Sequence, residues 1–245
     1  MRSLRKEAPF YFCCMPDQKI IITLDGWSSC GKSTLAKALA RELGYVFVDS
    51  GAMYRAITLY FIEQGVDIRN ESTVQHALQK IELKFVFNPA RGASDILLNG
   101  VNVEARIREL WVASKVSEVA SIAAVRRFAV VQQQRMGKEK GIVMDGRDIG
   151  TVVFPNAELK IFMTANKEIR AQRRFAELLA KDPAITLEAV RENLEQRDYM
   201  DSHREESPLR QASDARVLDN SQLTPEEQFQ LALSWAKEAI AKAGS

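Results

Sequence analysis

Short apolar runs alternate with helical periodicity along most of the chain. The run "KIIITLDG" (19–26) ends in a glycine, as a buried parallel strand often does. Further on, Leu35, Leu39 and Leu43 repeat every four residues, and Gly44 stands where a helix C-cap is expected. The pattern therefore predicts a strand, a loop and then a helix that stops at Gly44.

Four more apolar runs have the character of buried strands. They span 45–49, 142–145, 159–165 and 215–219, and helical stretches separate most of them, with a final helix over about 224–242. Such alternation is typical of α/β proteins built on a parallel sheet. We therefore expect an α/β fold with a five-stranded parallel sheet.

The block from about 80 to 105 breaks this rhythm. Its segments "IELKFVF" and "DILLNGVNV" alternate apolar and polar residues, and "NPARGAS" and "LNGV" supply turn residues between them. This pattern predicts a small antiparallel sheet inserted into the α/β core.

Composition narrows the class of protein. Of 245 residues, 46% are hydrophobic and 27% charged, which is ordinary for a globular protein. The 34 basic and 32 acidic residues give a net charge of +2, which argues against nonspecific binding of nucleic acid. No apolar run approaches the roughly 18 residues of a membrane span. We expect neither a nucleic-acid partner nor a membrane.

The first 18 residues differ from the rest. A basic cluster precedes a short apolar stretch that holds Pro9 and Pro16 and lacks a small-residue cleavage site, so a signal peptide is not predicted. We interpret residues 1–18 as a peripheral extension and Met15 as an alternative start.

The chain has three cysteines, Cys13, Cys14 and Cys30. Cys13 and Cys14 are adjacent and have no histidine or further cysteine at metal-ligand spacing, and no secretory signal is predicted. A reducing cytoplasm is therefore the expected location.

The segment "GWSSCGKST" carries the spacing G-x-x-x-x-G-K-S of a phosphate-binding loop. Glycines allow successive backbone N–H groups to point at phosphate oxygens, and the following helix adds its dipole. Lys32 would reach the β- and γ-phosphates of ATP, and Ser33 would bind Mg²⁺. The residues of the predicted loop are Gly26, Trp27, Ser28, Ser29, Cys30, Gly31, Lys32, Ser33 and Thr34.

The second motif, "DSGAMYRA" (49–56), follows the second strand. Ser50 starts a strand-to-helix turn, and Arg55 lies about one helical turn further, where it could hold a second phosphate group. A helix cap with a solvated arginine is the alternative. A guanine-reading N-K-x-D element, typical of switch GTPases, is absent from the sequence.

The third motif is "MDGRDIGTVVFP" (144–155). Asp145 ends a strand near the phosphate loop, where an acid can hold Mg²⁺. Gly146 allows a turn that projects Arg147 and Asp148 into the cleft above the strand ends. Asp148 could accept a hydrogen bond from an exocyclic amine, as carboxylates do with cytosine N4. The alternative is a structural Asp–Arg network in the turn.

Arginines are dense between positions 167 and 216. Arg197, Asp201 and Arg204 lie at i, i+4 and i+7, which predicts one helical face. A lid over a triphosphate needs several guanidinium groups, although half of these arginines could simply be solvated. The set comprises Arg170, Arg173, Arg174, Arg191, Arg197, Arg204, Arg210 and Arg216.

Six segments occur along the chain in the order "GKST", "DSGAMYRA", "DGRDIGTVVFP", "KIFMTA", "RAQRR" and "ESPL". With these segments the chain resembles the bacterial cytidylate kinases, a family of nucleoside monophosphate kinases. The resemblance covers 19–243. It implies transfer of phosphate from ATP, with Mg²⁺, to CMP or dCMP, and no partner beyond these nucleotides. It also implies one kinase domain over 19–245, with a core of 19–65 and 130–245, a monophosphate-binding insert over about 66–129 and a helical lid over about 167–205.

The resemblance implies residue roles as well. Cytosine would be read by Ser117, Arg126 and Asp148, and the sugar, including deoxyribose, would be held by Arg197 and Asp201. The acceptor phosphate would be bound by Arg55, Arg147 and Arg204, next to Ser50. The catalytic set would be Lys32, Arg147, Arg170, Arg174 and Arg204, with Arg173 at ATP and with Ser33 and Asp145 at the metal.

The phosphate loop departs from the family pattern at two positions. Trp27 replaces the usual proline, and Cys30 precedes Gly31. We expect activity to survive, and we hypothesise that alkylation of Cys30 would block the loop. Two alternatives remain open: a kinase with another small acceptor, such as AMP or UMP, and a regulatory protein that binds a nucleotide as a switch. Nothing in the sequence requires more than a monomer.

Overall fold

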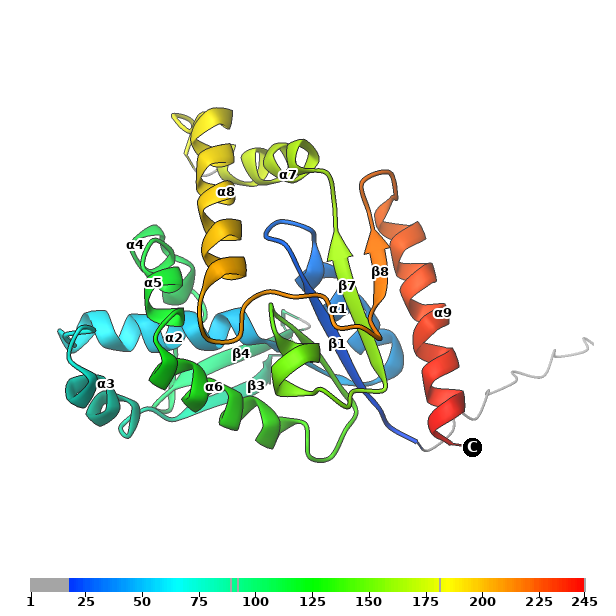
Figure 1. The fold of residues 1–245 in the computed structure, drawn as a ribbon, viewed down its shortest axis with the longest axis horizontal. Coiled ribbons are helices and arrows are strands. Elements are labelled where there is room, and N and C mark those ends of the chain that lie inside the picture. The colour runs from blue at the N-terminus through cyan, green and yellow to red at the C-terminus, as the bar shows by residue number, and fades with distance from the viewer. Residues whose placement is uncertain (1–17, 89, 92, 181, 245) are drawn as a thin grey trace, which may run out of the picture.

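The computed structural model describes residues 18–88, 90, 91, 93–180 and 182–244 (Figure 1). The predicted extension lies outside these residues except for Gln18, and so do Met15, Cys13 and Cys14.

Five strands form one parallel sheet, as the sequence predicts. They are β1 (Ile21–Gly26), β2 (Val46–Asp49), β6 (Ile142–Asp145), β7 (Leu159–Thr164) and β8 (Arg216–Asp219), in the order β2-β6-β1-β7-β8. The central strand, β1, pairs in parallel with β6 on one side and β7 on the other. The strand that carries the phosphate loop thus lies between two strands from the second half of the chain.

Helices cover both faces of this sheet. On one face α1 (Lys32–Leu43) and α9 (Pro225–Ala243) bury the side chains of Ile22, Leu24 and Val143. On the other face α2 (Ser50–Glu63) and α6 (Ala123–Met136) pack over Ile142 and Met144. Neighbouring residues of β6 thus point to opposite cores, as the two-residue period of a strand requires.

Two glycines shape the turn between β1 and α1. Gly26 has φ 143°, and a Cβ on this residue would lie 2.0 Å from the carbonyl oxygen of Met163. Gly31 has φ 81° and caps the start of α1 in the left-handed region, which favours glycine. At the other end, Gly44 is the left-handed C-cap, which confirms the predicted end of the helix.

The predicted antiparallel insert is present. After α3 (Glu71–Leu78), the strands β3 (Leu83–Asn88), β4 (Ala93–Leu98) and β5 (Val101–Asn102) form a sheet in the order β3-β4-β5. The buried residues of this insert belong to the same core as α2 and α6. A 3₁₀ turn, η1 (Arg106–Arg108), and the short helices α4 (Leu110–Ala113) and α5 (Val116–Ala120) then lead to α6.

Two helices, α7 (Lys167–Leu179) and α8 (Leu187–His203), extend beyond the carboxyl end of β7 (Figure 1). Their shared core contains the buried residues Ala171, Val190 and Leu194. The prediction that Arg204 lies on a helical face is wrong, because α8 ends at His203 and Arg204 is extended, with ψ 146°.

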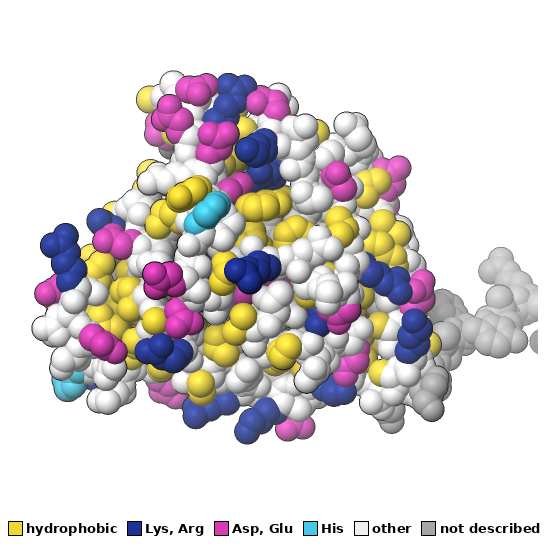
Figure 2. All heavy atoms as spheres, viewed as in Figure 1, with side chains coloured by type: hydrophobic (Ala, Val, Ile, Leu, Met, Phe, Trp, Pro, Cys, Tyr) yellow, Lys and Arg dark blue, Asp and Glu magenta, His cyan; other side chains and the backbone are white. Residues whose placement is uncertain are grey.

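The surface carries mixed charge. On the face shown in Figure 2, acidic and basic side chains are interspersed, in keeping with the net charge of +2. Among the residues described, no helix combines the length and apolar character needed to cross a bilayer.

Candidate active site

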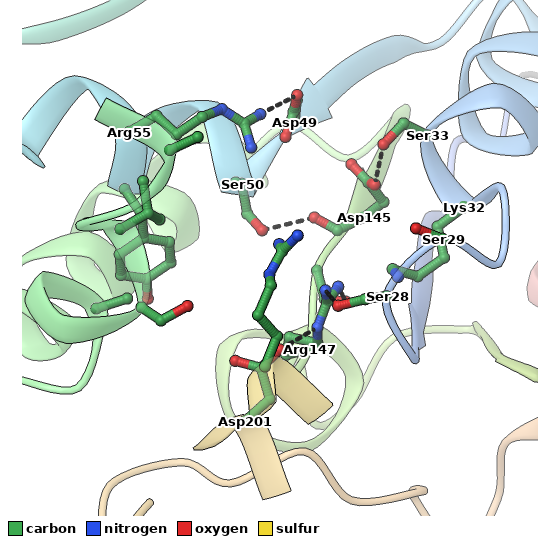
Figure 3. Close-up of a pocket in the computed structure, with 18 of the residues that line it drawn as sticks. Ser28, Ser29, Lys32, Ser33, Asp49, Ser50, Arg55, Asp145, Arg147 and Asp201 are labelled. Carbon is green, nitrogen blue, oxygen red and sulfur yellow. Dashed lines mark hydrogen bonds and ion pairs between the residues drawn. The ribbon is translucent and has the colours of Figure 1, made fainter. Parts of the chain in front are cut away.

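A cavity of about 480 Å³ opens at the carboxyl ends of β1, β2 and β6 (Figure 3). Its walls come from the phosphate loop, α2, α5, α6, the turn after β6, and the two helices beyond β7. The structure brings most of the predicted site residues together here. They are Ser28, Ser29, Gly31, Lys32, Ser33, Thr34, Ser50, Arg55, Ser117, Arg126, Asp145, Arg147, Asp148, Arg174, Arg197, Asp201 and Arg204.

The predicted residues Gly26, Trp27, Cys30, Arg170 and Arg173 are described but do not line this cavity. Cys30 is fully buried, and burial raises the pKa of its thiol. Because alkylation requires an accessible thiolate, the structure argues against the hypothesis that Cys30 is a sensitive site.

Arg170 lies behind the phosphate loop. Its Nη1 donates to Asp198 Oδ2 at 2.5 Å and to the carbonyl oxygen of Ser28 at 3.2 Å. The other oxygen of Asp198 accepts from the backbone N–H of Ser28 at 3.3 Å. Asp198, which the sequence did not single out, therefore ties both α7 and α8 to the loop.

Arg173 lies beside the same loop. Its guanidinium donates to the side-chain oxygen and to the carbonyl oxygen of Asn220, each at 3.0 Å. Asn220 in turn donates to the carbonyl oxygen of Cys30 at 2.8 Å. Arg173 thus contacts the loop through Asn220, outside the cavity.

Lys32 and Ser33 face the cavity from the start of α1. Lys32 Nζ donates to the carbonyl oxygen of Trp27 at 2.6 Å, and burial together with nearby Arg147 lowers its pKa. Ser33 Oγ donates to Asp145 Oδ2 at 2.6 Å, whereas Asp145 Oδ1 is buried and has no hydrogen-bond partner in the described part of the chain. Burial, and after it the carboxylate of Asp49, raises the pKa of Asp145.

Arg55 is held by the residue that starts its own helix. Asp49, the N-cap of α2, accepts from the N–H of Ala52 at 2.9 Å. Its other carboxylate oxygen accepts from Arg55 at 2.9 Å and from Arg108 at 3.1 Å. Burial would raise the pKa of Asp49, but the two arginines outweigh it and lower the pKa. Arg108 also lines the cavity. The sequence did not predict it as a site residue, because it belongs to no recognised motif.

The turn after β6 places Arg147 beside the phosphate loop. Arg147 Nε donates to Asp201 Oδ2 at 2.7 Å, and Nη2 donates to Ser28 Oγ at 2.9 Å (Figure 3). Arg204 Nη1 donates to Asp201 Oδ1 at 3.4 Å. Among the described residues, no hydrogen bond or ion pair fixes Arg197, and burial together with Arg147 lowers its pKa to about 10. This wall is rich in guanidinium groups, which bind phosphate well.

The end of the cavity holds a buried ion pair. Arg126 Nη2 donates to Asp148 Oδ2 at 2.6 Å, and both side chains are at most 3% exposed. Arg126 Nη1 donates to the carbonyl oxygen of Ala120, and its guanidinium lies over the ring of Tyr54 at 5.2 Å. The hydroxyl of Tyr54 is buried without a hydrogen-bond partner in the described residues. This end of the cavity therefore offers a carboxylate, a guanidinium and an aromatic ring.

A family model described as cytidylate kinase matches residues 22–238. The chain belongs to the cytidylate kinase family. It is 57% identical to a cytidylate kinase of Bacteroides thetaiotaomicron, across 92% of this chain and 98% of the relative. A cytidylate kinase of Parabacteroides distasonis is 55% identical, across 92% and 98%. One of Flavobacterium psychrophilum is 54% identical, across 88% and 97%. These matches confirm the resemblance seen in the motifs.

One solved structure shows a lower similarity. A shikimate kinase of Bacteroides thetaiotaomicron superposes with a TM-score of 0.47 at 14% identity, covering 91% of this chain and 98% of that one. The family assignment rests on the closer relatives described above.

Proposed function

We propose that the protein transfers the γ-phosphoryl group of ATP to CMP or dCMP, giving ADP and CDP or dCDP. One observation carries this proposal: a phosphate loop and a second group of arginines face each other across one cavity that ends in a buried carboxylate. A switch protein would need the phosphate loop alone. The geometry supports a site for a phosphorylated donor and a phosphorylated acceptor.

ATP would bind at the phosphate loop. The backbone N–H groups and the start of α1 favour anionic oxygens there. The contact of Lys32 with its own loop would be exchanged for contacts with the β- and γ-phosphates. Arg174, on α7, lines the cavity and would contribute positive charge from the lid side.

Mg²⁺ would bind beside Ser33 and Asp145, whose side chains are hydrogen-bonded to each other. The buried, unpartnered Oδ1 of Asp145 is an oxygen that a hard cation would accept as a ligand directly or through water. In the part of the chain that the structure describes, no cluster of three or more His, Cys, Asp or Glu residues could hold a metal by itself. Phosphate oxygens and water would therefore complete the coordination. Bound Mg²⁺ would neutralise charge on the transferring phosphoryl group.

The acceptor phosphate would lie between Arg55, Arg147 and Arg204, next to Ser50. Ser50 Oγ donates to the carbonyl oxygen of Asp145 at 2.6 Å, so the acceptor side and the proposed metal side share this contact. A nucleoside monophosphate is already largely dianionic at neutral pH, because its second phosphate pKa is about 6. It needs no general base, and positioning together with positive charge supplies the catalysis.

The nucleoside would occupy the far end of the cavity. The Asp148 carboxylate would accept from the exocyclic amine of cytosine, and Arg126 and Ser117 would donate to its acceptor atoms. Arg197 and Asp201 would contact the sugar. UMP carries a carbonyl oxygen where CMP carries the amine, so Asp148 would repel it.

We also propose that the enzyme acts in the cytoplasm as a monomer, with these nucleotides as partners and without nucleic acid or membrane. The absence of a predicted secretory signal supports the cytoplasm. Size-exclusion chromatography with light scattering should give the mass of one chain, and the mass of a dimer would contradict the proposed monomer.

The test follows the phosphoryl group. With γ-labelled ATP, Mg²⁺ and CMP, the label should appear in CDP, and Lys32→Ala should slow the transfer by about 10²-fold or more. Lys37→Ala, on the same helix and outside the cavity lining, is the matched control. Binding of ATP without transfer to any acceptor would overturn the proposal and favour the switch alternative.

A further inference from the structure

Asp25 is a buried carboxylate that the chemistry above does not use. It immediately precedes Gly26 on β1, is 5% exposed and lies outside the lining of the cavity. Its Oδ1 accepts from the backbone N–H of Ile149 at 2.8 Å, and its Oδ2 accepts from that of Gly150 at 2.7 Å. Each oxygen thus holds one amide of a segment that lies more than a hundred residues away in sequence.

The two amides belong to the segment that carries the acceptor site. We call residues 146–150 the acceptor turn, because Arg147 and Asp148 lie in it. The turn enters a single π-helical turn, η2 (Ile149–Val153), and the N–H of Gly146 donates to the carbonyl oxygen of Leu24 at 2.9 Å. The acceptor turn is therefore anchored at both ends to β1, directly before the phosphate loop.

The approach between the two segments is close. A Cβ on Gly150 would lie 2.8 Å from Thr23 Oγ1 and 3.3 Å from Asp25 Oδ2. A larger residue at position 150 would push the turn away from β1. The absence of a side chain at this position is what allows both hydrogen bonds to form.

We propose that Asp25 is a positioning residue for the acceptor: its carboxylate fixes the acceptor turn against the phosphate loop and so controls acceptor affinity and base selectivity. The inference rests on the proposed function, because it takes Asp148 as the base-reading group. Asp25 touches neither nucleotide and acts through Arg147 and Asp148.

An ionised carboxylate suits this role, because it presents two acceptor oxygens to two donors. An asparagine could accept from one amide only, and its NH₂ group would face the other N–H. Burial raises the pKa of Asp25 to about 6, although the hydrogen bonds from Gly150 and Ile149 lower it. The nearby charges have smaller effects, since Asp148 raises this pKa and Lys32 lowers it. The group is therefore mostly ionised at neutral pH.

The experiment compares Asp25→Asn with Thr23→Val. Thr23 lies two residues earlier on β1, against the same turn, and its buried hydroxyl has no partner among the described residues, so its loss should change little. For Asp25→Asn we expect the KM for CMP to rise about tenfold or more, since a charge-assisted hydrogen bond is lost. The KM for ATP should stay within about threefold, and the ratio of kcat/KM for CMP over UMP should fall.

Two results would overturn the inference. Equal losses toward ATP, CMP and UMP would indicate a general folding role, and unchanged kinetics would indicate no role. If the wild-type protein does not phosphorylate CMP at all, the proposed function fails, and the positioning of the turn is decided by a separate measurement.

The separate measurement uses the wild-type protein, so it tests the inference even if Asp25→Asn does not fold. In the wild-type protein without ligand, amide hydrogen exchange at Ile149 and Gly150 should be as slow as in the paired residues of β1. Exchange at the rate of an exposed loop would show that Asp25 does not hold the turn, and it would overturn the inference whatever the substrate is.

Discussion

At the scale of single residues, three carboxylates orient arginines in the cleft and behind the phosphate loop. Asp49 holds Arg55 and Arg108 together, Asp201 holds Arg147, and Asp198 holds Arg170. Each arginine is thereby oriented before a substrate arrives. Preorganised charge of this kind stabilises a transferring phosphoryl group more effectively than a mobile side chain could.

Replacement of Arg55 tests this arrangement. We expect Arg55→Ala to lower kcat/KM for CMP by about 10²-fold, because a donor to the acceptor phosphate is lost while Asp49 keeps Arg108 as a partner. Arg106→Ala is the matched control, since Arg106 is half-exposed and pairs with Glu63 outside the cavity. Values of kcat/KM near the wild type for Arg55→Ala would contradict its role.

Cys30 should be a slow thiol. It is fully buried and burial raises its pKa, so little accessible thiolate is available at neutral pH. In a Cys13→Ser, Cys14→Ser background, we expect iodoacetamide to label Cys30 at least about tenfold more slowly than free cysteine, as followed by mass spectrometry. Labelling as fast as that of free cysteine would show that the loop opens.

At the scale of elements, α7 and α8 share a small apolar core. This core has three buried apolar side chains among the described residues, whereas α9 packs in the much larger core on one face of the parallel sheet. Few buried contacts mean low local stability.

We therefore expect the amides of α7 and α8 to exchange with solvent faster than those of α9 in the free protein. ATP and CMP together should slow the exchange in α7 and α8, because Arg174, Arg197 and Asp201 would then contact ligands. Hydrogen exchange by mass spectrometry measures both effects, and α9 is the internal control. Equal protection of all three helices without ligand would contradict a mobile lid.

The elements themselves were largely visible in the sequence. All five strands of the main sheet start and end within two residues of their predicted positions, because apolar runs and glycine stops are local signals. The order of the strands and the partners of Asp25 and Asp198 were not visible. The contacts of Asp25 with Ile149 and of Asp198 with Ser28 join residues 124 and 170 positions apart, which no local pattern encodes.

The structure brings most of the predicted site residues into one cavity, while their roles stay predictions. Most motif residues of the phosphate loop, together with Arg147 and Asp148 of the acceptor turn, line one cavity, whereas Arg170 and Arg173 lie behind or beside the loop. Helical spacing predicts which face of a helix carries an arginine. It does not predict whether that face lines the cavity or packs behind the phosphate loop.

At the scale of the whole molecule, the buried Asp25 should link stability to pH. Its pKa is about 6 in the folded protein against 3.8 for the unconstrained group, so folding favours the protonated form. The stabilisation that this gives is complete below about pH 4 and is lost as the pH rises through 6.

The free energy of unfolding of the wild type, minus that of Asp25→Asn, should therefore decrease between pH 4 and pH 6. Titrating groups that do not interact with Asp25 cancel in this difference. Urea unfolding across this range measures it. A difference that rises with pH would contradict the raised pKa of Asp25.

The whole cleft is assembled from the phosphate loop, the acceptor turn, α5 of the insert and the helices beyond β7. The central claim is that this assembly selects cytidine monophosphates as acceptors. The most direct test measures kcat/KM for CMP, dCMP, UMP, AMP and GMP with ATP and Mg²⁺, beside a reaction without acceptor, with products resolved by chromatography. We predict that CMP and dCMP exceed UMP by about tenfold or more and the purine nucleotides by a larger factor. A preference for AMP or GMP, or ATP turnover that no acceptor accelerates, would contradict the claim.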